Sequence, residues 1–328
     1  MTLRRRDFIS LLGGAAAAWP KAARAQQSAM PVVGFMGLTT PEGYGSTVEG
    51  VRKGLTEAGL VEGRNLKIEF AWAESRYERF PMLAAELVRR GANVIFTSSP
   101  AAVRAAVAVS ASTPVVFIMG EDPVEEGVVA SLNRPGGNVT GISDFANQLA
   151  GKILGLLCDT VPRATVLGLL VNPNHPHVEA DTKAAQAAAA ALGRELKVLK
   201  VATEADIEPA FAAMVQLGVG ALFVSTDPFF TDQREKLAAA AARDAIPAIY
   251  PRREFPAAGG LMSYEADRFE TSRQAGAYVG RILKGARPAD LPVLQSSKFE
   301  LVINMKAAKG LRLEIPSGVL AISDEVIE

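Results

Sequence analysis

The segment Thr97-Ser98-Ser99-Pro100 has the chemistry to hold an anion without a basic side chain. Ser99 can cap a helix that begins at Pro100, because proline suits the first helical position. The free backbone N–H groups of such a helix start, with the positive end of the helix dipole, attract a carboxylate or a phosphate. The same residues are also typical of a plain Ser-Pro cap, so both interpretations stay open at this point.

Asp227 is the second candidate, because it is a carboxylate followed by the aromatic pair Phe229-Phe230. Such a group could face a positive group of a bound molecule, and an Asx turn before Pro228 explains it equally well. Three aromatic residues could line the edge of a binding surface or simply pack at its rim: Tyr44, Trp72 and Tyr264.

A metal centre is not expected. His175 and His177 are the only two histidines, and two ligands at this spacing do not complete a zinc site. Cys158 is the only cysteine, so no intrachain disulfide can form, and its place in a predicted helix favours a small buried apolar role. The chain also lacks GxSxG, P-loop and GxGxxG motifs, which removes the common hydrolase, NTPase and dinucleotide signatures. We therefore expect no cofactor and no catalytic residues.

Length and charge restrict the function further. The 328 residues suit two domains, and the chain holds 35 basic and 35 acidic residues. Without residues 1–25, which hold five basic residues and one acidic residue, 30 basic residues face 34 acidic ones, a net charge of −4. Nucleic-acid binding calls for a basic surface, so it is not expected.

Residues 1–25 are typical of an export signal. Arg4-Arg5-Arg6 form the charged head, a weakly apolar run follows, and Ala23-Arg24-Ala25 is a cleavage site before Gln26. The segment 5–9 resembles a twin-arginine motif, and an ordinary secretory signal with one extra arginine is the alternative. The apolar run is too short for a permanent anchor, and no cysteine follows the cleavage site. We expect a soluble periplasmic protein without a lipid anchor there.

Strand-like and helix-like segments alternate through the first half of the chain. This alternation is the signature of a doubly wound parallel sheet. The expected strands are 31–38, 65–71, 93–97 and 114–119, and the expected helices are 46–59, 79–90 and 100–110.

The segment Gly120–Asp144 is expected to lead from one lobe into a second. Asp122 can cap a short helix over 122–132, the run 133–138 breaks it, and Val139–Ser143 is a short strand. The alternation then repeats, which predicts two lobes of one architecture. The expected helices here are 145–157, 178–192, 206–217 and 232–244, and the expected strands are 165–171, 195–201, 220–225 and 247–250.

The tail completes the two lobes. It holds a short strand over 260–264, a helix over 268–284 and an edge strand over 298–304. We predict lobe 1 from residues 31–143 plus about 258–291, and lobe 2 from residues 144–257 plus about 292–328. Several crossings between lobes make a hinge.

In open parallel sheets, ligands bind beyond the carboxyl ends of the strands. Two lobes that point these edges at each other enclose a cleft. The rule selects eight loops: 39–46, 72–77, 98–101, 120–123, 172–177, 226–231, 251–254 and the turn after Tyr264.

The sequence resembles the ABC-transporter substrate-binding proteins of the tryptophan/tyrosine-binding type, which have the type I periplasmic binding protein fold. The resemblance runs from about Pro31 to Glu328. It rests on the blocks GLVEGRNLKIEFAWAESRYERFPMLAAELV, DPVEEGVVASLNRPGGNVTG, DPFF, PAIYPRREFPAAGGLMSY and KFELVINMKAAKGL.

The resemblance implies an α/β protein with two Rossmann-like lobes, parallel sheets and a multi-crossing hinge. It implies capture of a small solute, such as an amino acid or aromatic compound, and delivery to an ABC permease at the inner membrane by a monomeric protein. The positions that match the cleft loops of that fold are Thr39, Ser98, Ser99, Asp122, Asn172, Asp227 and Tyr264.

The alternative is an exported α/β enzyme, such as a hydrolase that uses Asp122 or Asp227. The lack of a nucleophile–base pair with a recognisable spacing, in a chain with two histidines, favours the binding protein. A repressor's ligand-sensing domain does not fit, because an export signal occupies the place where a DNA-binding helix pair would be needed.

Overall fold

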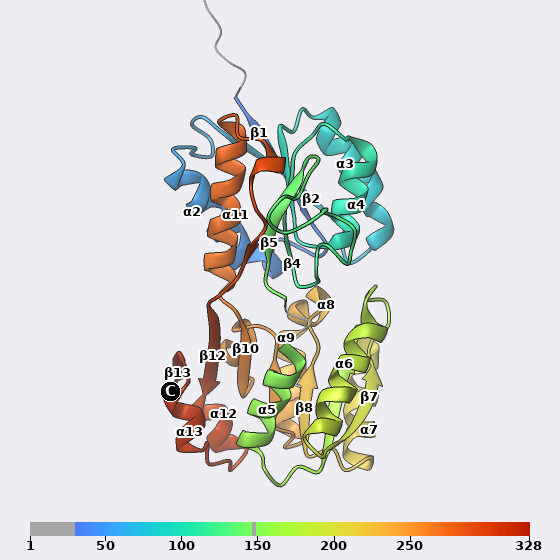
Figure 1. Cartoon of the computed structure of the whole chain (residues 1–328). Coiled ribbons are helices and arrows are strands. Elements are labelled where there is room, and N and C mark those ends of the chain that lie inside the picture. Colours follow the sequence, from blue (N-terminus) through green and yellow to red (C-terminus); the bar gives the residue numbers. More distant parts are fainter. Residues whose placement is uncertain (1–29, 146–148) are drawn as a thin grey trace, which may run out of the picture.

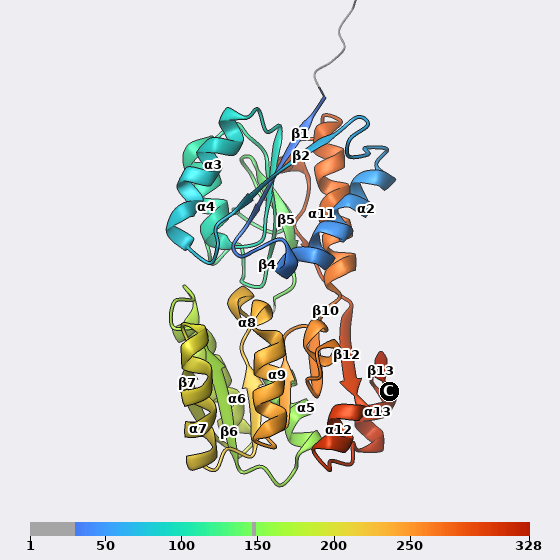
Figure 2. The same ribbon diagram turned by 180° about the vertical axis from the view of Figure 1, so that it is seen from behind.

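The computed structural model describes residues 30–145 and 149–328, which form two α/β lobes stacked end to end (Figures 1 and 2). The export signal predicted over residues 1–25 lies outside the described residues. No helix in the described part of the chain combines the length and apolar character needed to cross a bilayer.

The first lobe is built on a six-stranded sheet with the order β11-β5-β4-β3-β1-β2, and all its strand pairs are parallel. Its strands are β1 (Val32–Gly37), β2 (Lys67–Trp72), β3 (Val94–Thr97), β4 (Val115–Met119), β5 (Val139–Ser143) and β11 (Leu294–Gln295). Its helices are α2 (Gly45–Glu57), α3 (Phe80–Arg89), α4 (Pro100–Val109) and α11 (Arg268–Leu283), with short 3₁₀ turns at η2 (Glu42–Tyr44), η3 (Tyr77–Arg79) and η6 (Pro288–Asp290).

The second lobe repeats this plan on a seven-stranded sheet with the order β13-β12-β10-β9-β8-β6-β7. Its strands are β6 (Val166–Val171), β7 (Glu195–Lys200), β8 (Ala221–Val224), β9 (Ala248–Tyr250), β10 (Met262–Ala266), β12 (Phe299–Asn304) and β13 (Glu325–Ile327). Its helices are α5 (Ala150–Thr160), α6 (Val178–Ala191), α7 (Ile207–Gln216), α8 (Pro228–Asp232), α9 (Arg234–Arg243), α10 (Glu254–Ala257), α12 (Met305–Gly310) and α13 (Ser317–Ala321), with a 3₁₀ turn at η5 (Glu204–Asp206). Only the pair β10–β12 is antiparallel among the pairs in this described sheet.

The predicted fold class is confirmed by these two sheets. Five successive strands in each lobe follow the doubly wound order 2-1-3-4-5, and apolar layers cover both faces of each sheet. In this order the chain reverses its direction of growth between β1 and β3 in the first lobe, and between β6 and β8 in the second. Such switch points open a crevice at the carboxyl ends of the strands.

The helix predicted over 122–132 is wrong. Asp122 does cap a turn, since its Oδ1 accepts a hydrogen bond of 2.8 Å from the Val124 N–H. Gly127 then adopts a φ of +65°, a conformation that ends the helical path after one turn. The remaining residues before β5 form irregular turns, so the segment is a loop on the first lobe.

Two predicted boundaries in the tail also need correction. Met262–Ala266 pairs with β9 and β12, so this strand belongs to the second sheet and not to lobe 1. Leu294–Gln295 pairs with β5, so it belongs to the first sheet. The chain therefore crosses between the lobes between β5 and α5, between β10 and α11, and between β11 and β12. β12 was predicted to be an edge strand, but it is internal. Strand β13, which was not predicted, pairs with β12 and forms the edge of the sheet.

Helices α2 and α11 pack with their backbones in direct contact. Figure 1 shows α2 and α11 side by side, and four glycines lie at their contact: Gly50 and Gly54 on α2 meet the backbone of α11, whereas Gly276 and Gly280 on α11 meet Val51 and Ala58. A Cβ atom added at Gly54 would lie 2.0 Å from the carbonyl oxygen of Arg273, and one at Gly276 would lie 2.3 Å from that of Val51. Only glycine permits this approach, which brings the late segment α11 back onto the first lobe and aims its N-terminus at the space between the lobes.

Candidate ligand-binding site

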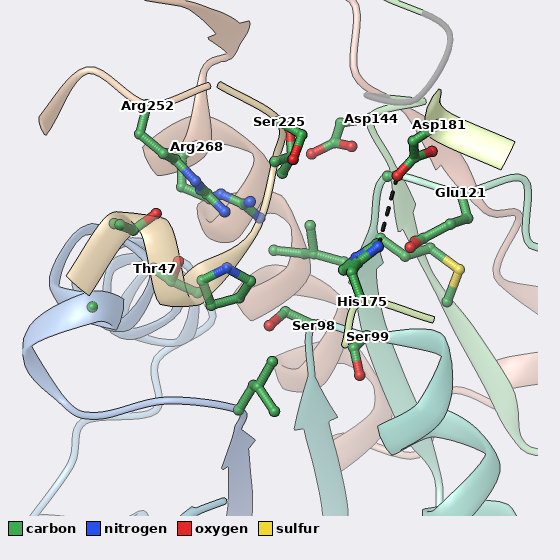
Figure 3. A pocket seen from close by; sticks show the side chains of 18 of the residues that line it. Thr47, Ser98, Ser99, Glu121, Asp144, His175, Asp181, Ser225, Arg252 and Arg268 are labelled. Atoms are coloured by element: carbon green, nitrogen blue, oxygen red, sulfur yellow. Dashed lines mark ion pairs between the residues drawn. The ribbon is translucent and has the colours of Figure 1, made fainter. Parts of the chain in front are cut away.

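A cavity lies between the lobes, at the carboxyl ends of the parallel strands of both sheets (Figure 3). Leu38 follows β1 and Ser98 follows β3, so the switch point of the first lobe lines it. His175 follows β6 and Ser225 follows β8, so the switch point of the second lobe lines it as well. The loops selected from the sequence by the position of strand ends thus contribute to the lining of this cavity in both lobes.

The predicted helix start at Ser99 is present. Ser99 has extended backbone angles, and its hydroxyl accepts a hydrogen bond of 3.1 Å from the Ala102 N–H at the start of α4. The buried Tyr44 hydroxyl accepts a hydrogen bond of 3.1 Å from the Leu38 N–H and shares one of 2.9 Å with the Ser98 hydroxyl. Tyr44 therefore holds Ser98 at the cavity wall, where both serines offer uncharged hydrogen-bonding groups.

Acidic groups from both lobes meet on a second side of the cavity. Glu121 comes from the loop after β4, and Asp181 comes from the first turn of α6 (Figure 3). Burial raises the pKa of Glu121 to about 7, with further contributions from nearby Asp144 and Asp181. Burial likewise raises the pKa of Asp181 to about 6. Both carboxyls thus lie in an environment that favours a proton or a positive group of a ligand.

The two histidines lie beside these acids. Among the described residues, no three His, Cys, Asp or Glu side chains are placed so that they could hold a metal ion together. His175 Nδ1 lies 3.7 Å from Asp181 Oδ2, and burial lowers the pKa of His175 to about 4, which leaves its imidazole neutral at pH 7. His177, on the second lobe, lies with its Nδ1 3.4 Å from Glu126 Oε1 on the first lobe. The loop 172–177, which carries both histidines, thus contacts the first lobe.

Two arginines line a third side of the cavity, away from the acidic groups (Figure 3). Arg252 follows β9, and its Nη1 lies 3.6 Å from Glu265 Oε2. Arg268 is the first residue of α11. Sequence reasoning selected the loop of Arg252 and the turn that leads to Arg268, but it did not single out either side chain.

The seven residues that sequence reasoning proposed for the site occupy different places. Ser98 and Ser99 line the cavity, whereas the other five lie outside its lining. Asp122 caps the turn before Gly127, and Tyr264 stacks on Phe299 with ring centroids 5.9 Å apart. Buried Asn172 accepts a hydrogen bond of 2.9 Å from the Asn174 N–H.

Asp227 and Thr39 are both buried near the boundary of the lobes. Asp227 caps α8, since its Oδ1 accepts a hydrogen bond of 2.8 Å from the Phe229 N–H. Burial raises the pKa of Asp227 to about 6. Thr39 lies against Gly43 and Asp232, so it contributes to contact between the first lobe and α8. Thr39 and Asp227 therefore lie behind the residues that line the cavity and do not line it themselves.

Comparison with known proteins agrees with this architecture. Residues 37–327 match the model of a family described as ABC transporter substrate binding protein. The chain is 25% identical over 282 residues to the tyrosine-binding protein of Clostridioides difficile (strain R20291), a match that covers 86% of this chain and 81% of the relative.

Two solved structures have the same fold. A conserved domain protein from Vibrio cholerae O1 biovar El Tor matches with a TM-score of 0.83 and 25% identity, over 90% of this chain and 99% of its own. An ABC domain in complex with L-Trp from Streptococcus pneumonia matches with a TM-score of 0.81 and 24% identity, over the same shares of the two chains. The family match spans nearly all of the described residues, and the chain belongs to the ABC transporter substrate-binding protein family.

Proposed function

We propose that this protein captures one small carboxylate-bearing solute, an amino acid or an aromatic compound, and delivers it to an ABC permease at the inner membrane. The observation that carries the proposal is the cavity between the lobes, which combines hydrogen-bonding, acidic and basic groups from both sheets. The solute would be held by closure of the lobes about the hinge, a rearrangement typical of periplasmic binding proteins. The names of the relatives support aromatic amino acids as the first compounds to test.

Binding without turnover is the test of this proposal. The mature protein would be screened by thermal shift against amino acids and aromatic acids, since a solute that binds only the folded state raises the melting temperature. Calorimetry and product analysis on each hit should give one site per monomer and unchanged solute. The second candidate, an exported hydrolase, would be favoured instead by sustained formation of product.

We also propose export to the periplasm, with a mature protein that begins at Gln26. The twin-arginine-like residues of the signal motivate this proposal. In the native host, replacement of both Arg5 and Arg6 by lysine should remove the protein from the periplasm, as measured by fractionation. Detection by mass spectrometry of an intact start at Met1 or Thr2 in the periplasmic protein would contradict cleavage.

A further inference from the structure

We propose that Arg252 and Arg268 form an anion-binding subsite that takes the carboxylate of a dipolar solute, while the positive end of the solute lies toward Glu121 and Asp181. This inference rests on the proposed function and specifies how the solute lies. It differs from the first interpretation of Ser99 and Pro100, in which the start of α4 holds the carboxylate. In the orientation proposed here, Ser98 and Ser99 supply uncharged hydrogen bonds.

The first argument is the missing charge partner of Arg268. This guanidinium lines the cavity but forms no salt bridge or hydrogen bond with any residue in the described ranges. Burial and the neighbouring Arg252 lower the pKa of Arg268, and the charges of Asp144 and Glu265 oppose this lowering only in part. A cation partly withdrawn from water without a direct hydrogen bond or salt bridge costs free energy, which an anion in the cavity would offset.

The second argument is that the positive charge of Arg252 is only weakly compensated by a carboxylate. Its side chain is 16% exposed, and its contact with Glu265 is 3.6 Å, longer than a charge-assisted hydrogen bond. Burial raises the pKa of Glu265 to about 7, so this carboxyl only partly offsets the two guanidinium groups. Two neighbouring guanidinium groups suit a carboxylate, which accepts hydrogen bonds on both oxygens.

The third argument is the separation of charge across the cavity. Figure 3 places the two arginines on one side and Glu121 with Asp181 on the other. The first turn of α2 adds to the positive side, since Thr47 lines the cavity and the described α2 start has no side-chain cap. A solute with one negative and one positive end would match both sides at once.

The test is calorimetry with matched pairs of probes: L-tyrosine with L-tyrosinamide, L-tryptophan with L-tryptophanamide, and any further amino acid found by thermal shift with its amide. Parent protein should bind the acids at least tenfold more tightly than the amides. Arg268→Gln and Arg252→Gln should each weaken acid binding about ten- to hundredfold and leave amide binding nearly unchanged, because a charge-assisted contact has been lost only for the acid.

Arg253→Gln is the matched control, because Arg253 is the next residue, is exposed and pairs with Glu325 at 2.6 Å. This variant should bind both members of each pair as the parent does. A second readout separates a binding role from a structural one. Without any solute, Arg268→Gln should melt at the same temperature as the parent or higher, since a half-buried guanidinium that forms no hydrogen bond or salt bridge in the described ranges has been removed.

Each remaining outcome counts against the subsite. If the parent binds acids but the arginine variants bind them equally well, or if acids and amides bind alike, the subsite is refuted and the proposed function stands. If Arg268→Gln melts well below the parent and its acid affinity is unchanged, the residue is structural. If no acid in the screen binds the parent, the proposed function fails and the subsite fails with it.

Discussion

Replacing Gly54 by alanine should lower the free energy of unfolding by about 3 kcal/mol or more, because overpacking against backbone leaves no flexible atom to move aside. The new methyl group would lie 2.0 Å from the Arg273 carbonyl oxygen and 2.6 Å from the Ala277 nitrogen. Helices α2 and α11 would have to separate, and the apolar layer between them would open. Urea unfolding followed by circular dichroism measures the loss.

Gly155→Ala on α5 is the matched control for this substitution. Gly155 also lies inside a helix, but a Cβ atom there meets nothing within 4 Å. Alanine favours the helix over glycine by up to about 1 kcal/mol, so this variant should be as stable as the parent or more stable. An unchanged urea midpoint for Gly54→Ala would contradict the close backbone contact between α2 and α11.

The second large effect concerns pH, because burial raises the pKa of several carboxyl groups near the lobe boundary. The pKa values are about 7 for Glu121 and Glu265, and about 6 for Asp181, Asp227 and Asp232. A carboxyl with a raised folded-state pKa contributes stability that is fully present below its unfolded pKa and is lost as pH rises through the folded value. These groups therefore favour the folded state in mildly acidic solution.

His175 acts in the opposite direction. Its folded pKa, lowered to about 4, means that its contribution is present above pH 6.5 and is lost as pH falls from there. Between pH 6 and pH 8 the five carboxyl groups outweigh this single histidine. We expect the free energy of unfolding to fall by about 2 kcal/mol from pH 6 to pH 8, since each pKa unit corresponds to about 1.4 kcal/mol.

Urea unfolding at the two pH values tests this expectation. Glu121→Gln removes one of the two groups with the highest pKa, so the difference between pH 6 and pH 8 should shrink. Glu49→Gln, at an exposed position on α2, should leave the difference as it is in the parent. Equal stability of the parent at pH 6 and pH 8 would show that the buried carboxyl groups do not titrate in this interval.

The sequence predicts most elements of the fold because their signals are local. Apolar runs such as Val32–Gly37 and helices with a marked stop residue depend on periodicity and caps, which a linear pattern records. The prediction of a helix over 122–132 was wrong. The apolar residues have helical spacing, but Gly127 adopts a positive φ that ends the helical path. The lobe assignment of Met262–Ala266 failed because strand pairing is decided by tertiary contacts.

The candidate site was predictable as a set of loops and much less as a set of side chains. Ser98 and Ser99 line the cavity because a strand end and a helix cap fix their positions. Asp227 has the same local signature, yet its carboxylate caps α8 from behind the lining. Arg268 and Asp181 reach the cavity only because the lobes approach each other, and no local pattern records that approach.

The interleaved course of the chain also has a consequence for synthesis. The apolar face of α2 and its sheet, with Val51 and Leu55, is covered by Ala275 and Val279 of α11. More than 200 residues of nascent chain separate these partners, and most of the second lobe lies between them. The amino-terminal lobe therefore cannot complete its core while the ribosome is still making the second one, and its exposed apolar face must be shielded from aggregation until the last quarter of the polypeptide emerges.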